Sequence, residues 1–188
     1  MTDEELRTLG PLAVLVGVWE GKPGLDVAPD PAREPEDTPF SERMVFESIG
    51  LVDNHEQLLW GLRYRTEVKR LSNGESFHEE LGYWLWDAEH QQVMRCFVVP
   101  RGVSVLAGGS ATADARSFRV EAVRGSSIYG VVSNAFLDEQ FRIERFTMNV
   151  TLEDDGAFRY DEDTVMRMPG REELFHHTDA CVLRRVEG

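Results

Sequence analysis

From residue 40 onward the chain repeats one pattern, in which a stretch of alternating apolar and polar side chains is followed by a short turn. Within residues 57–68, for example, Trp60, Leu62 and Tyr64 occupy every second position. Successive side chains of a β-strand point to opposite faces, so this period predicts strands that bury one face and expose the other. The pattern favours an antiparallel sheet over a helical bundle.

Turn sequences divide the alternating region into hairpins. Ser72-Asn73-Gly74 and Glu153-Asp154-Asp155-Gly156 are the clearest of them. About ten strands are expected, at residues 41–49, 57–68, 77–86, 92–99, 103–107, 117–123, 127–132, 140–152, 157–166 and 173–186. A meander of this length splits into a sandwich or closes, and closure removes the exposed edges. The sequence therefore predicts an all-β fold, an antiparallel up-and-down β-barrel of about ten strands, wide enough for a cavity.

The beginning of the chain departs from this pattern. Thr2 followed by Glu5 is a capping-box pattern, which predicts a short N-terminal helix over about residues 3–9. The apolar segment 12–18 is expected to form a second short helix that runs into a strand. Residues 22–39 hold most of the eight prolines, mixed with acidic residues. Proline cannot donate to a sheet ladder, so we expect a flap or insertion at about residues 22–39, outside the sheet, on a single β-barrel domain spanning residues 1–188.

Charge and composition limit the partners. Asp and Glu number 34 against 20 Lys and Arg, which gives a formal charge of −14. Such a chain repels phosphate backbones and anionic lipid surfaces, so we expect neither nucleic acid nor a membrane as partner. The N-terminal residues lack a signal-peptide pattern, and Cys96 and Cys181 are too far apart for a metal-binding pair. We expect a cytoplasmic monomer or homodimer.

Histidines are the most informative polar residues, because no hydrolase, zinc-protease or nucleotide-binding motif is present. His176 and His177 are adjacent at the start of the last expected strand, so one should face inward and the other outward. His78 begins another strand. A structural zinc needs three or four ligands, whereas haem iron needs one protein ligand and an apolar pocket. An inward imidazole is therefore either a hydrogen-bonded rim residue or a haem ligand.

Several short stretches point to one known family. Gly17-Val18-Trp19-Glu20-Gly21 is similar to a GxWxGxG first strand, and His78-Glu79-Glu80-Leu81-Gly82-Tyr83 is similar to an HxExGY strand. Residues 174–185 look like a closing strand in which a histidine precedes an alternating tail, and Pro100-Arg101-Gly102 sits where that family has a Pro-x-Gly turn. Together these stretches resemble the nitrobindin family of haem-binding β-barrels, also described as fatty-acid-binding-protein-like.

The resemblance implies a ten-stranded barrel that holds ferric haem b at its mouth. Some members are assigned nitric oxide binding and peroxynitrite isomerisation, so a peroxynitrite isomerase is a candidate activity. Carried over residue by residue, His177 matches the histidine that ligates the iron. His78 matches a histidine that lines the haem pocket, and Met166 matches a pocket methionine.

Two other interpretations suit the same sequence. One is a lipocalin-like or fatty-acid-binding-protein-like carrier of a small apolar ligand without haem. In such carriers an arginine pairs with the ligand carboxylate, and the candidates by strand position are Arg63, Arg65, Arg142 and Arg145. The other is a barrel that acts through its surface, with the acidic segment 26–37 as an interaction site.

Overall fold

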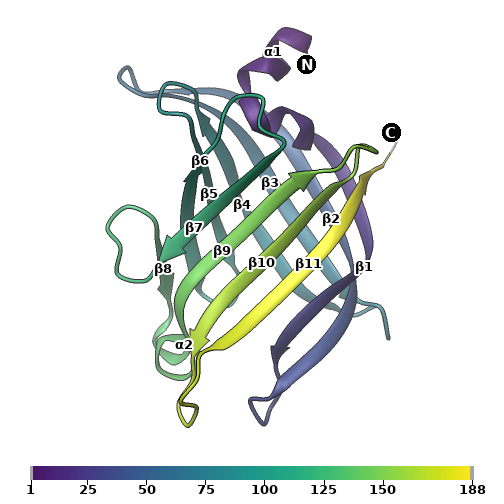
Figure 1. The fold of residues 1–188 in the computed structure, drawn as a ribbon, viewed down its shortest axis with the longest axis vertical. Coiled ribbons are helices and arrows are strands. Elements are labelled where there is room, and N and C mark those ends of the chain that lie inside the picture. The colour runs from purple at the N-terminus through teal and green to yellow at the C-terminus, as the bar shows by residue number, and fades with distance from the viewer. Residues whose placement is uncertain (1, 187–188) are drawn as a thin grey trace.

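The computed structural model describes residues 2–186, apart from the side chains of residues 3–5, where Glu5 of the expected capping box lies. The described residues form a sheet of eleven strands with three short helices (Figure 1). The strands are β1 (Gly17–Pro29), β2 (Pro35–Asp53), β3 (Leu58–Arg70), β4 (Ser76–Asp87), β5 (Gln92–Val99), β6 (Val103–Ser110), β7 (Ser117–Val123), β8 (Gly130–Ser133), β9 (Arg142–Leu152), β10 (Phe158–Arg167) and β11 (Phe175–Arg185). The helices are α1 (Asp3–Thr8), the 3-10 helix η1 (Gly10–Leu15) and α2 (Ala135–Gln140).

The strands close into a ring in the order β5-β4-β3-β2-β1-β11-β10-β9-β7-β6, and β6 pairs back with β5. Every pairing is antiparallel, and most neighbours in the ring are also neighbours along the chain. The short β8 pairs with β6 over residues 103–106, beyond the single β6–β7 pair Gly108↔Glu121. This closed ring of ten strands confirms the predicted all-β barrel.

The prediction that residues 22–39 stay outside the sheet is wrong. They form the outer half of the β1–β2 hairpin, paired from Gly24↔Phe40 to Pro29↔Pro35 (Figure 1). The prolines are accommodated because the register shifts between Gly21 and Gly24, and because β3 pairs with β2 only from Phe40 onward. The segment therefore projects from the barrel, as a flap would, but its backbone is regular β-sheet.

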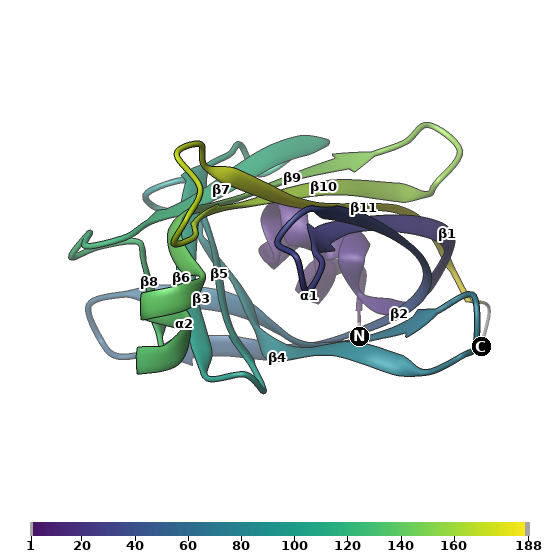
Figure 2. The same cartoon turned by 90° about the horizontal axis from the view of Figure 1, so that it is seen from below.

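One end of the barrel is filled by the N-terminal segment. Viewed from the other end, α1 lies at the far side of the barrel opening (Figure 2). Leu9, Leu12 and Leu15 are at most 1% exposed, and they pack into the core with Trp19 and Trp86. The Trp19 indole donates a hydrogen bond to the Leu15 carbonyl at 2.7 Å, which fixes η1 on the first strand.

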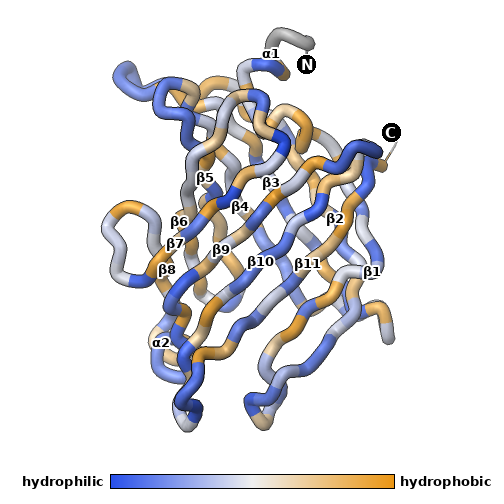
Figure 3. Tube along the Cα trace, in the orientation of Figure 1, coloured by the Kyte–Doolittle hydropathy of each residue, from blue (hydrophilic) through white to orange (hydrophobic). Residues whose placement is uncertain are grey.

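Hydropathy alternates along the barrel strands, as the tube in Figure 3 shows. The turns at residues 71–75, 100–102 and 168–174 join successive antiparallel strands at the end opposite η1. Aromatic pairs such as Trp19–Phe158 and Trp84–Phe118 fill the interior, with ring centroids 4.9 and 5.8 Å apart. No helix among the described residues is long and apolar enough to cross a membrane. A ligand site is therefore expected at the open end of the barrel.

Candidate functional site

A cavity of about 450 Å³ lies inside the open end of the barrel. Its volume falls within the roughly 300–1,000 Å³ typical of small-molecule sites. Apolar side chains from opposite walls line much of it, among them Phe40, Met44, Phe97, Phe146, Met148 and Met166. The predicted pocket residues His177, His78 and Met166 all lie on this lining.

The two adjacent histidines of β11 point to opposite sides of the sheet, as alternation predicts. His177 lines the cavity, and its side chain is 31% exposed. His176 lies on the outer surface, 56% exposed, where its Nδ1 is 2.8 Å from Asp163 Oδ2 on β10. Only His177 of this pair is placed to meet a ligand in the cavity.

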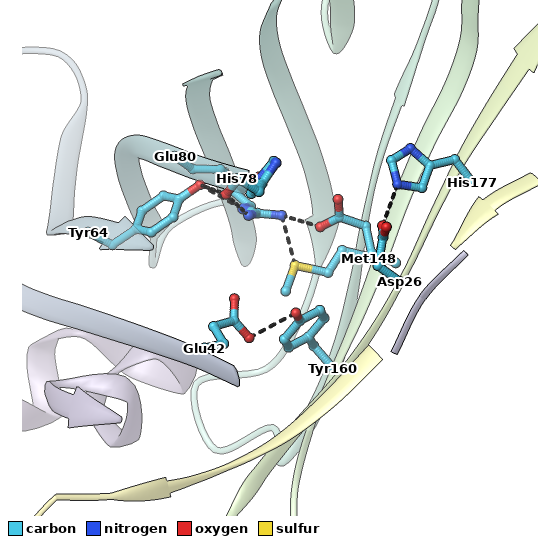
Figure 4. A network of polar contacts seen from close by, with 10 residues as sticks. Asp26, Glu42, Tyr64, His78, Glu80, Met148, Tyr160 and His177 are labelled. Atoms are coloured by element: carbon cyan, nitrogen blue, oxygen red, sulfur yellow. Dashed lines mark hydrogen bonds and ion pairs between the residues drawn. The ribbon is translucent and has the colours of Figure 1, made fainter. Parts of the chain in front are cut away.

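A carboxylate from β1 holds the His177 ring. Asp26 is 8% exposed, and its Oδ1 lies 2.7 Å from His177 Nε2 (Figure 4). The two residues meet because β1 and β11 are paired, with Asp26 opposite Asp179 and Val27 opposite Thr178. Metal-ligating histidines commonly donate one ring N–H to such a carboxylate while the other nitrogen binds the metal. Among the described residues, Nδ1 of His177 has no hydrogen-bond partner, so one ring nitrogen stays available.

Asp179 adds a second carboxylate beside this pair. It lies directly across from Asp26 on the inner face, and burial, with Glu162 and Asp26 nearby, raises its pKa well above the usual value. Donor atoms of Asp26, His177 and Asp179 all lie within 4.8 Å of one another. The wall around His177 is therefore polar and acidic, although the rest of the cavity is largely apolar.

A buried ionic network forms the inner floor of the cavity (Figure 4). Arg95 on β5 is 2% exposed and donates to Glu80 at 2.5 Å, to Glu162 at 2.7 Å and to the Tyr64 hydroxyl at 3.0 Å. Burial alone would raise the pKa of Glu80. The charge of Arg95 and the hydrogen bonds that Glu80 forms with His78 and Tyr64 lower this pKa to about 2. Arg95 and Glu80 therefore stay ionised at neutral pH.

His78 belongs to the edge of this network. Its Nε2 is 3.3 Å from Glu80 Oε1, and the side chain is about half-buried on the lining. Burial opposes protonation of His78, but the hydrogen bond and charge of Glu80 outweigh it and raise the pKa. His78 is thus a cavity residue that is already engaged with a carboxylate.

Glu42 is a further buried acid on the lining, and it has no contact with Arg95. The Tyr160 hydroxyl donates to its Oε2 at 2.9 Å (Figure 4). Burial raises the pKa of Glu42 to about 8, although the Tyr160 hydrogen bond opposes the shift. Glu42 is consequently protonated over most of the neutral range.

Sequence reasoning missed these interior groups. Glu42, Glu80 and Arg95 sit at inward positions of β2, β4 and β5. Glu42 lies between the buried Phe40 and Met44, and Arg95 between the buried Val93 and Phe97. These groups could have been found from the sequence, because each is a charged residue at a position where strand alternation predicts a buried side chain. The proposed ligand-pairing arginines were wrong: Arg63, Arg65, Arg142 and Arg145 are all off the lining. Arg63 and Arg65 alternate with the inward Leu62 and Tyr64 and so face solvent.

Comparison with known families identifies the fold and its ligand class. The model described as THAP4-like, heme-binding beta-barrel domain matches residues 8–185. The chain belongs to this family. The match runs from the N-terminal helical segment to the end of β11, and it confirms the predicted relation to the nitrobindin-like haem-binding barrels.

A solved structure supports the same assignment at the level of fold. Rv2717c from M. tuberculosis superposes on this member of the haem-binding barrel family with a TM-score of 0.69, at 20% sequence identity. The alignment covers 96% of this chain and 98% of that one, so the two barrels correspond over their whole length. No curated protein matches the chain.

Proposed function

We propose that the chain binds haem b in this cavity, with the imidazole of His177 as the ligand of the iron. The observation that carries the proposal is the position of His177, a cavity-lining histidine on the last strand of a haem-binding barrel. The residues present suit the group: a nitrogen donor held by a carboxylate, a sulfur side chain at Met166, and apolar walls of the kind that bury a porphyrin.

The protein's own contribution is to orient the donor and to line the walls above the ionic floor with apolar side chains. Asp26 fixes the ring of His177, while Phe97, Phe146 and Met148 exclude water from the adjacent space. When bound, ferric haem supplies an iron with an open position for nitric oxide or peroxynitrite, the reactants that the family resemblance names. Isomerisation of peroxynitrite by this chain belongs to the same proposal.

The test is a spectroscopic titration with hemin. The wild-type chain should develop a sharp Soret band with a stoichiometry of one, and His177→Ala should abolish it. His176→Ala is the matched control, because this neighbour lies on the outer surface beside Asp163. If the band of His177→Ala matches that of the wild type, the ligand assignment is wrong. Recovery of the band in His177→Gly by added imidazole would support it further.

The alternative of a fatty-acid carrier meets an obstacle in the floor of the cavity. A carrier that held the ligand carboxylate at the floor would need a free cation there, but Arg95 is already bound by both Glu80 and Glu162. Introducing a third carboxylate there would add repulsion without a new partner. Native mass spectrometry of the purified protein separates the two functions, since haem and an acyl chain differ in mass.

A further inference from the structure

Charges are unevenly distributed between the interior and the rim of the cavity. Seven carboxylates lie on the lining. Glu36 and Glu79 are exposed, and the other five are buried or partly buried: Asp26, Glu42, Glu80, Glu162 and Asp179. Arg95, the arginine at the floor, is 2% exposed and is neutralised by two of them. An anionic group that entered this region would lose its hydration beside an arginine that is already neutralised, which is unfavourable.

Two arginines lie on the lining at the opposite, outer end. Arg70 is the last residue of β3, and Arg101 lies in the turn between β5 and β6. Over residues 2–186, neither guanidinium forms an ion pair with a carboxylate. On the outer wall, Arg63 pairs with Glu47 and Arg184 with Asp155, whereas Arg65 and Arg145 form no ion pair within residues 2–186. Arg70 and Arg101 differ from Arg65 and Arg145 because they line the cavity. In a chain with a charge of −14, unpaired arginines at a cavity rim are positioned to receive an anion.

The positions of both arginines are constrained, Arg101 by the hydrogen bonds of its turn and Arg70 by an aromatic ring. The Arg101 turn has Gly102 in the left-handed region at φ 74°, and its Arg101 carbonyl accepts a 2.6 Å hydrogen bond from the Asn134 side chain. Asn134 also caps α2 by accepting from Leu137 N at 3.0 Å, so the turn and the helix fix one another. The Arg70 guanidinium lies 4.5 Å from the centre of the Phe77 ring, a cation–π contact that keeps it at the rim.

We propose that Arg70 and Arg101 form an anion-binding rim that receives the propionate groups of haem, so that haem enters with its apolar edge first. This inference rests on the proposed haem function. In the ring of strands β5 lies opposite β11, so the Arg101 turn is across the mouth from His177. Arg70, at the end of β3, lies between them in the ring, so the two arginines occupy a part of the rim away from His177. Arginine suits this role because its planar group binds carboxylates bidentately.

The test compares hemin with its dimethyl ester, in which both propionates are uncharged. The wild-type chain should bind hemin more tightly than the ester. Arg70→Gln and Arg101→Gln should each weaken hemin binding about fivefold, as expected for a partly exposed ion pair, and should leave the ester unchanged. The double variant should lose the preference for hemin. Glu79→Gln, which removes an exposed carboxylate from the same lining, should act in the opposite direction and tighten hemin.

Arg63→Gln, on the outer wall, is the control and should change neither dissociation constant. Equal affinities of the wild-type chain for hemin and ester would refute the anion rim and leave the haem function intact. Equal losses for both porphyrins in the arginine variants would also refute it, because they would indicate a structural role. If neither porphyrin binds the wild-type chain, the proposed function fails and the rim fails with it.

Discussion

The contribution of Asp26 to the site can be tested separately from that of His177, the proposed iron ligand. Its carboxylate is 2.7 Å from His177 Nε2, and it comes from a different strand, 151 positions away. Carboxylate partners of this kind fix the orientation and raise the basicity of a ligating imidazole. The chemistry of His177 therefore depends on a residue that no local motif connects to it.

We expect Asp26→Asn to weaken hemin binding by about 10- to 100-fold, the range seen when such carboxylate partners are removed. The substitution keeps an oxygen at the same place but removes the negative charge. The measurement is the rate of hemin transfer to an excess of a tight haem-binding protein, with Asp163→Asn as control beside the outward His176. Tighter binding by Asp26→Asn would show that Asp26 obstructs the ring nitrogen.

Glu42 makes the stability of the barrel depend on pH. Its native pKa of about 8 lies above the ordinary value of 4.5. Above pH 4.5 the unfolded chain releases this proton while the native state keeps it, so stability falls as pH rises toward 8. The loss amounts to roughly 5 kcal/mol at most. Glu42→Gln should therefore match the wild type near pH 4.5 and be more stable at pH 8, as measured by urea unfolding.

Glu80 supplies the contrast, because its native pKa is lowered to about 2. Its ionised form stabilises the native state above pH 4.5, and this contribution is lost as pH falls through 2. Glu80→Gln should be destabilised at pH 7 and approach the wild type at strongly acidic pH. Parallel pH profiles for the Glu42 and Glu80 variants would contradict both assignments.

At the level of elements, closure of the barrel depends on close approaches between strands. Gly109 on β6 is the tightest: a Cβ there would lie 1.9 Å from the Arg119 carbonyl oxygen of β7. No L side chain fits against a backbone atom at that distance. The β6–β7 contact that completes the ring is thus formed at Gly108-Gly109. From the sequence alone, these two glycines predict only the end of a strand.

We expect Gly109→Ala to destabilise the protein by about 1–3 kcal/mol, the usual effect of overpacking, and to loosen the β6–β7 contact. Urea unfolding measures the loss, and amide hydrogen exchange of residues 117–123 locates it. Ser104→Ala, at an exposed position of the same strand, is the control. Unchanged exchange in β7 would show that the added methyl group is accommodated without loosening the β6–β7 contact.

Most strands could be predicted from alternation, because hairpin turns and an apolar inner face act locally. The outer part of the β1–β2 hairpin could not be predicted in this way. Its pairing depends on a register shift between Gly21 and Gly24 and on the pairing of β1 with β11. The helix α2 was also missed; it is only six residues long and has no buried residue. Its formation depends on Asn134, which caps it and ties it to the Arg101 turn.

At the level of the molecule, the barrel has one filled end and one functional end. The filled end is held by η1, in which Leu12 is fully buried and Val14 is 39% exposed. The functional end carries the cavity, His177 and the rim arginines. Strand alternation required one of His176 and His177 to face inward, and the family resemblance selected His177. The interior ionic network could not be predicted, since cross-barrel partners such as Arg95 and Glu162 are far apart in sequence.

We expect Leu12→Ala to destabilise the barrel by about 2–5 kcal/mol through the cavity it leaves, while the hemin dissociation constant stays unchanged because the site is at the other end. Val14→Ala, in the same helix, should cost little. Thermal or urea unfolding measures the first effect and hemin titration the second. A large loss of hemin affinity in folded Leu12→Ala would mean that the two ends are coupled.

The pairing of β1 with β11 has a consequence for biosynthesis. Asp26 leaves the ribosome early, but it meets His177 only after the segment Phe175–Arg185 has emerged and zipped against the first strand. Without that segment neither β1 nor β10 has this neighbour, and the ring of strands cannot close. Uptake of the proposed haem would therefore follow closure of the barrel, and a truncated product that lacks Phe175–Arg185 is expected neither to close nor to bind hemin.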